Sequence, residues 1–215
     1  LQAEFGWNYE VGLRWKPKNN RLYFNANLFH FGLEDAIVRR INQNDTEYFI
    51  NAGGTLQNGV ELEAVALLIK DQTTLLKELK WRSSYTLSKF KFNDFTLGNT
   101  SFDGNKLTGV PEHVLINSLA FTFKQGFYFF AQHNHTSAIP VNDANTVFAK
   151  KYDLVDVKLG NRDVKLGNSK FEVYFGLNNL LNENYSLGDD LNAVSVRYFN
   201  AAATRNFYTG IGIRL

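Results

Sequence analysis

Apolar and polar residues alternate along most of this chain, and this period of two restricts its fold more than any other feature. In residues 8–16, one set of alternate positions holds Tyr9, Val11, Leu13 and Trp15, while the other set is polar apart from one glycine. Successive side chains of an extended strand point to opposite faces of a sheet. The pattern therefore predicts strands with one apolar and one polar face, rather than amphipathic helices.

Nine stretches carry this pattern and are predicted to be strands. They cover residues 8–16, 21–35, 57–69, 77–90, 114–123, 127–136, 152–161, 170–180 and 205–215. The stretch 127–136 has aromatic residues at both sets of positions, so its orientation stays open. Aromatic residues make up 15% of the chain, which favours extended structure because such side chains pack well on a pleated surface.

The predicted connections alternate in length. The short ones lie near 17–20, 71–76, 124–126 and 162–169, and the long ones near 37–48, 91–112, 137–150 and 182–204. Outer-membrane barrels show this arrangement, with the long loops extracellular, whereas a soluble sandwich has no reason to sort its loops in this way. The first and ninth strands would then run in the same direction, so nine antiparallel strands do not close. We expect an arc of a larger antiparallel transmembrane β-barrel.

Several other classes of protein are disfavoured. No segment approaches eighteen consecutive apolar residues, as a membrane-spanning helix would require. The net charge of +2 provides no strong field for nucleic acid. The chain has no cysteine nucleophile, no phosphate-binding loop and no serine between two glycines in a nucleophile elbow, so we expect neither an enzyme nor a resident cofactor.

A series of short motifs runs along almost the whole chain. They are NYEVGLR at 8–14, NAG at 51–53 with GVELE at 59–63, SYTLS at 84–88, GNKL at 104–107 with GVPEH at 109–113, NNLLN at 178–182 with NY at 184–185, and RNFY at 205–208 before the closing residues. In this order and spacing, the motifs resemble the C-terminal strands of TonB-dependent outer-membrane receptors.

The resemblance implies a barrel of about 22 strands that encloses a plug domain. Residues 1–215 would supply the last nine strands, and the plug and the N-terminal strands would lie outside this chain. The implied partners are the TonB complex, acting through the plug, the barrel-assembly machinery, and the lipid of a Gram-negative outer membrane. The implied function is TonB-energised uptake of a ferric siderophore or a similar iron complex. A receptor for cobalamin, haem or oligosaccharide, a passive porin and a soluble carbohydrate-binding sandwich remain as alternatives.

The polar faces of the predicted strands carry charged residues that we expect in the barrel lumen. These residues are Arg14, Glu61, Glu63, Arg82, Glu172 and Arg214. They would pair with one another or with the plug through charge-assisted hydrogen bonds. On the opposite face, Tyr9 and Trp15 flank an aliphatic middle, as in the aromatic girdles at the two water interfaces of a membrane barrel.

Four residues are candidate ligand contacts. His133 and His135 lie two apart near the outer end of a predicted strand, where imidazoles can bind a metal or a haem-like ligand. Arg39 and Arg40 lie at the base of an outer loop, and a guanidinium group can hold an anionic chelate through two hydrogen bonds. Adjacent residues of an extended chain point to opposite faces, so only one of these arginines is expected to reach the lumen.

A pair of acidic residues in the last long loop, Asp189 and Asp190, is a weaker candidate. Two carboxylates attract a cation, but calcium sites use a fuller set of oxygen ligands. We therefore interpret this pair as part of a solvated loop.

Overall fold

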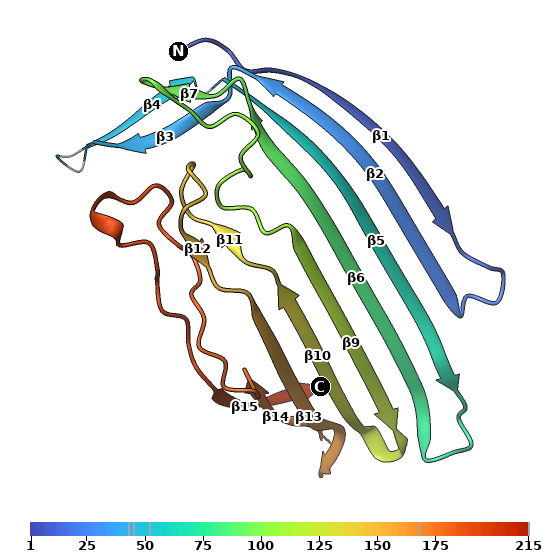
Figure 1. Cartoon of the computed structure of the whole chain (residues 1–215). Coiled ribbons are helices and arrows are strands. Elements are labelled where there is room, and N and C mark those ends of the chain that lie inside the picture. Colours follow the sequence, from blue (N-terminus) through green and yellow to red (C-terminus); the bar gives the residue numbers. More distant parts are fainter. Residues whose placement is uncertain (43, 45, 52, 168, 215) are drawn as a thin grey trace.

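Nine long strands form one antiparallel sheet that curves as a tilted wall (Figure 1). The computed structural model describes residues 1–42, 44, 46–51, 53–167 and 169–214. The strands, in their order across the sheet, are β1 (Phe5–Trp15), β2 (Leu22–Glu34), β5 (Gly54–Lys70), β6 (Leu76–Asn93), β9 (His113–Phe123), β10 (Phe127–Thr136), β13 (Tyr152–Leu166), β14 (Ser169–Asn178) and β15 (Asn206–Arg214). All nine predicted strands are present, which confirms the all-β fold.

Helical structure is minor within the described part of the chain. It consists of two single 3₁₀ turns, η1 (Lys124–Gly126) and η2 (Val194–Val196). Among the residues that the structure describes, no helix is long and apolar enough to cross a membrane.

Six short strands lie in segments that the sequence analysis assigned to long connections. They pair as three hairpins: β3 (Ile37–Ile41) with β4 (Glu47–Asn51), β7 (Thr96–Leu97) with β8 (Thr100–Ser101), and β11 (Ile139–Pro140) with β12 (Phe148–Ala149). These hairpins are separate from the large sheet. The long loops are therefore partly folded rather than irregular.

The predicted end of the seventh strand was wrong. Strand β13 continues to Leu166. Within this extension, a bulge between Asn161 and Val164 shifts its register against β14. A bulge adds a residue to one strand and so interrupts the alternation of faces, which is why the sequence pattern stopped there.

The register places the apolar positions of neighbouring strands on the same face. Val11 lies opposite Leu28, Leu28 opposite Val60, and Val60 opposite Leu87. Val11 is 73% exposed and Leu28 is 56% exposed. Soluble monomers rarely present a continuous apolar surface that spans several strands. This face therefore fits contact with lipid.

The opposite face of the same strands is polar. One row across it holds Arg14, Asn25, Glu63 and Ser84. On this face, a guanidinium nitrogen of Arg82 lies 2.7 Å from a carboxylate oxygen of Glu63. The predicted lumen charges therefore share one face, except that the side chain of Arg214 lies outside the described residues.

Strands β1 and β15 lie at the two edges of the sheet. Among the described residues, no hydrogen-bonded ladder joins them (Figure 1). An unpaired strand edge is unstable in hydrocarbon, because its backbone groups have no water to bond. The open sheet is consistent with an arc of a larger barrel.

Close packing on the polar face depends on glycine at particular positions. The ring of Phe29 in β2 covers Gly59 in β5, and the carbonyl oxygen of Leu87 in β6 would lie 2.9 Å from a Cβ atom placed there. Gly32, on the outer face of β2 between β1 and β5, is different, because its nearest neighbour, a methyl carbon of Leu56, would lie 3.8 Å from such an atom. Gly59 is thus required by packing, whereas Gly32 is not.

We predict that Gly59→Ala destabilises the full-length protein by about 1–3 kcal/mol, because the added methyl group overpacks the wall. Urea unfolding in lipid vesicles, followed by the gel mobility of the folded barrel, measures this change. The matched variant Gly32→Ala should leave the unfolding midpoint nearly unchanged. Equal midpoints for the two variants would contradict the packing role of Gly59.

Candidate functional site

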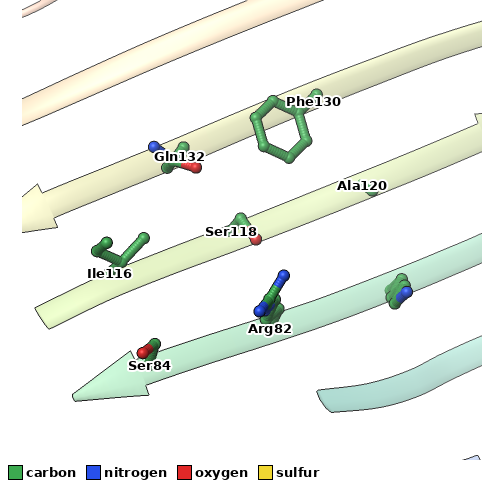
Figure 2. A pocket seen from close by; sticks show the side chains of 8 residues that line it. Arg82, Ser84, Ile116, Ser118, Ala120, Phe130 and Gln132 are labelled. Atoms are coloured by element: carbon green, nitrogen blue, oxygen red, sulfur yellow. The ribbon is translucent and has the colours of Figure 1, made fainter. Parts of the chain in front are cut away.

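The polar face of the wall is hollowed between β6, β9 and β10. A cavity of about 460 Å³ lies there, and its polar side chains point into the same space (Figure 2). It is lined by Lys80, Arg82, Ser84, Ile116, Ser118, Ala120, Phe130 and Gln132. Because residues of three adjacent strands converge on it, this face is the concave one and corresponds to the lumen of a barrel.

A second group of charges lies on the same face, toward the short-turn end of β13 and β14. The hydroxyl of Tyr128 donates a hydrogen bond of 2.8 Å to Glu172. The ammonium group of Lys158 lies 3.9 Å from the ring centre of Tyr174, and the guanidinium of Arg162 lies 4.3 Å from that of Tyr128. Cation–π contacts and this hydrogen bond hold the side chains in place, so the inner wall presents fixed polar groups.

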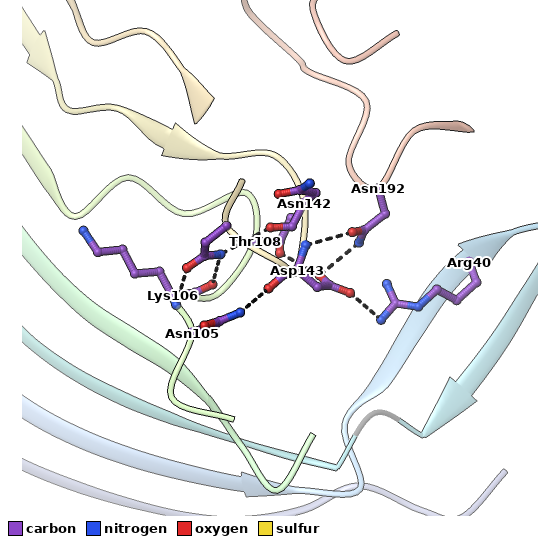
Figure 3. A network of polar contacts seen from close by, with 8 residues as sticks. Arg40, Asn105, Lys106, Thr108, Asn142, Asp143 and Asn192 are labelled. Carbon is purple, nitrogen blue, oxygen red and sulfur yellow. Dashed lines mark hydrogen bonds and ion pairs between the residues drawn. The ribbon is translucent and has the colours of Figure 1, made fainter. Parts of the chain in front are cut away.

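At the opposite end of the wall, one aspartate joins four long loops. Asp143 lies within 2.7 Å of a guanidinium nitrogen of Arg40 and accepts hydrogen bonds from the Thr108 hydroxyl at 2.6 Å and the Asn192 amide at 3.0 Å (Figure 3). Its backbone N–H donates to Asn192 at 3.0 Å, and its carbonyl accepts from Asn105 at 2.8 Å. We call Asp143 and these four partners the loop hub.

The loop hub is buried. The side chains of Arg40 and Asp143 are only 8% and 7% exposed, and the guanidinium of Arg40 lies 5.4 Å from the ring centre of Phe95. Phe95 and Phe92 form the apolar cluster beneath the hub. Removing one partner of a buried ion pair leaves an uncompensated charge, at a cost of about 3–5 kcal/mol. The hub is therefore the main polar constraint on the loops.

A cavity of about 460 Å³ opens beside the loop hub. It is lined by Val38, Arg39, Arg40, Phe92, Leu107, Thr108, Asp143, Asp189, Asp190, Leu191 and Asn192. Arg39 is 56% exposed and pairs with Glu47 at 2.6 Å. Within the described part of the chain, Nε of Arg40 and Oδ1 of Asp189 are buried without a hydrogen-bond partner. The exposed residues Arg39 and Asp190 give this mouth cavity charged groups of both signs.

Another cavity, of about 420 Å³, lies between the last two long loops and is more apolar. Phe148, Tyr185 and Phe199 contribute its aromatic surface, and Lys150 contributes one charge. Burial raises the pKa of the Tyr185 hydroxyl, so this group remains a neutral hydrogen-bond donor. A bulky ligand with apolar groups would fit such a surface.

The geometry agrees with a comparison of the sequence with family models. Residues 1–180 match the model described as TonB dependent receptor-like, beta-barrel. The chain belongs to this family. Barrels of this family lie in the outer membrane of Gram-negative bacteria, so the predicted location is confirmed. The family consists of receptors and transporters rather than enzymes.

Solved structures of the family share the fold of this chain. The ferric yersiniabactin uptake receptor FyuA from Yersinia pestis is 21% identical with a TM-score of 0.72, over 97% of this chain and 29% of its own. The ferric-catecholate import receptor Fiu from Escherichia coli K12 is 17% identical with a TM-score of 0.71, over 98% and 27%. The copper transporter OprC is 15% identical with a TM-score of 0.70, over 97% and 31%. This chain thus spans less than a third of each of these proteins.

The structure separates the four candidate ligand residues of this receptor barrel. Arg39 and Arg40 point to different sides of β3, as expected for adjacent residues of a strand, and both line the mouth cavity. Sequence reasoning missed Asp143, the partner of Arg40, since no local motif marks this aspartate. The role of the two arginines in ligand binding stays a prediction.

The two candidate histidines lie on the outer face, away from the mouth cavity. His135 lies opposite Leu115, which in turn lies opposite Tyr85 and shares the apolar face. Nε2 of His133 and Nδ1 of His135 both lie 2.9 Å from the same oxygen of Asp153. The structure therefore does not bring the histidines together with the arginines, and it adds Asp153, which sequence reasoning did not select.

We predict that Arg40→Met releases the long loops without unfolding the wall. The buried carboxylate of Asp143 loses its counter-charge, so the hub should lose about 3–5 kcal/mol of local stability. Hydrogen exchange of residues 105–108 and 189–192 in the full-length receptor should then be faster.

The matched control is Arg39→Met. Its ion pair with Glu47 is more than half exposed, so its loss should cost no more than about 1 kcal/mol and leave exchange at the hub unchanged. Slow exchange at the hub in Arg40→Met would show that the ion pair does not hold the loops.

Proposed function

We propose that the full-length receptor takes up a ferric siderophore or a similar iron complex, with energy supplied by the TonB complex. In this proposal, the remainder of the protein provides a plug and the other strands of the barrel, and the barrel-assembly machinery inserts it. The observation that carries the proposal is the mouth cavity, which is lined by the buried Arg40 and by the exposed, positively charged Arg39. The fold shared with two receptors for ferric complexes supports it.

The two arginines have different roles in this proposal. Arg39 is the ligand contact, because an exposed ion pair contributes little and an anionic chelate can replace Glu47 as its partner. Arg40 is a positioning residue, because its pairing with Asp143 holds the loops that form the cavity. A preformed cavity reduces the entropy lost when a ligand is captured.

Uptake then divides into two stages. The loops and the upper lumen bind the complex, and the TonB complex displaces the plug so that a path opens through the barrel. The wall remains rigid, since its seven inner strands are paired on both sides and polar groups of its inner face are held by contacts such as the hydrogen bond from Tyr128 to Glu172. The inner-wall cavity of β6, β9 and β10 would face the plug and the passing ligand.

Copper uptake is a second candidate function. A copper transporter shares this fold, and the carboxylates of Asp189 and Asp190 line the mouth cavity beside the arginines. Carboxylate groups bind many divalent cations, so the cavity does not select iron by its chemistry alone.

Growth of a strain that lacks the parent gene tests the proposal. Under iron limitation, with defined ferric chelates supplied one at a time, the strain should fail to grow on at least one chelate that supports the wild type. A growth defect seen only under copper limitation would indicate that the receptor takes up copper rather than an iron complex. Normal growth on every metal source would contradict both proposals.

Complementation of the same strain tests the role of Arg39. Arg39→Ala should raise the chelate concentration for half-maximal uptake by about tenfold to a hundredfold, the loss expected for a hydrogen bond to a charged group. Arg21→Ala removes an exposed arginine at the short-turn end and should behave as the wild type. If the two variants transport alike, Arg39 does not contact the ligand.

A further inference from the structure

Three lysines extend the outer face of the wall beyond its apolar part. In β6 the outward positions run from Leu79 through Tyr85 to Leu87, and the next two are Lys89 and Lys91. Lys91 lies opposite Lys106, which belongs to the loop after β6. All three lysines are exposed. We call Lys89, Lys91 and Lys106 the outer lysine patch.

The loop segment that carries Lys106 is fixed to the wall. Its neighbours Asn105 and Leu107 turn inward. Asn105 bonds to Asp143 in the loop hub (Figure 3). Leu107 packs on the apolar cluster. Backbone hydrogen bonds of 2.9 Å join both neighbours to β6. Successive side chains of this extended segment point to opposite sides, so Lys106, which lies between two inward-facing residues, faces outward. The patch is therefore built into the fold.

The height of the patch follows from the strand geometry. Tyr85 lies nine residues from Leu76, the start of β6, which corresponds to roughly 23 Å of height for a strand tilted by about 40°. That is close to the height of the apolar band of such barrels, about 25 Å. Tyr85 stacks on His113 at 6.1 Å between ring centres, as an interfacial aromatic residue. Lys89 and Lys91 then lie roughly 10–15 Å higher than Tyr85, so Lys89 reaches the outer side of a headgroup layer about 5–8 Å thick and Lys91 lies just above it.

The charge of this surface is positive. A cavity of about 400 Å³ is lined by Ser88, Lys89, Phe90, Lys91, Lys106, Val110 and Glu112. Glu112 accepts a hydrogen bond of 2.6 Å from Lys106, and this bond lowers the pKa of its carboxyl, so the group stays ionised. One carboxylate balances one of the three lysines. Within the described part of the chain, Lys89 and Lys91 form no ion pair, so two ammonium groups remain beside the cavity.

We propose that the outer lysine patch binds phosphate groups of the outer-leaflet lipid of the membrane that surrounds this barrel. The patch continues the lipid-facing side of β6, so the molecules that meet the apolar band place their headgroups at this height. The ammonium groups of lysine bind phosphate as point charges, and the cavity between them admits a phosphorylated sugar head. Such binding anchors the wall at a defined depth and is independent of the transported ligand.

Native mass spectrometry of the full-length receptor in nanodiscs tests this proposal with lipid A as the probe. The triple variant Lys89→Gln/Lys91→Gln/Lys106→Gln should bind lipid A on the order of a hundredfold more weakly than the wild type, since each basic residue near an anionic surface contributes about a factor of five. The double variant Lys89→Gln/Lys91→Gln leaves the pair of Lys106 with Glu112 intact and serves if the triple variant folds poorly.

The charge-matched control is Lys16→Gln/Lys18→Gln/Lys70→Gln, whose exposed lysines lie at the short-turn end. It should retain lipid A within about twofold, and dephosphorylated lipid A should bind the wild type as weakly as lipid A binds the triple variant. If the patch binds free inorganic phosphate but does not retain lipid A, the proposal that its ligand is a lipid is overturned. Equal losses in both triple variants, or no loss in either, would overturn the patch itself.

Discussion

The demand that every backbone N–H and C=O group inside a bilayer find a hydrogen-bond partner governs this structure. Antiparallel pairing satisfies it for the seven inner strands, each of which has a neighbour on both sides. Strands β1 and β15 have one neighbour each among the described residues. The wall therefore depends on further strands of the same barrel, and the period of two then sorts its side chains between lipid and lumen.

The loops above the wall have only the short ladders of their own hairpins, so contacts between side chains help to link one loop to another. Asp143 receives partners from the loops that contain Arg40, Thr108 and Asn192. Burial makes this arrangement effective, because a buried charge without its partner is costly. The mouth cavity is thus a consequence of how the loops satisfy a buried carboxylate. The same loop segment turns Lys106 outward, so the mouth cavity and the outer lysine patch share one support.

The sequence predicts the wall far better than the mouth. All nine long strands can be predicted from the alternation of apolar and polar residues. This works because residues two apart in a strand point to the same face of the sheet and so meet the same environment. The loop hub could not be predicted, since Arg40, Asp143 and Asn192 are far apart in the chain and no local pattern links them. The outward direction of His133 was also hidden, because its strand has aromatic residues on both faces. Only the register with β9 resolves it.

Accessibility of single cysteines tests the central claim, that one face of this wall meets lipid and the other the lumen. The chain has no cysteine of its own, so spin labels at residues 79–86 in β6 of the full-length receptor report each position separately. In lipid bilayers, odd-numbered positions such as Leu79 and Trp81 should be accessible to oxygen, and even-numbered positions such as Lys80 and Arg82 should not. Accessibility without this period, or with the two faces exchanged, would contradict the account.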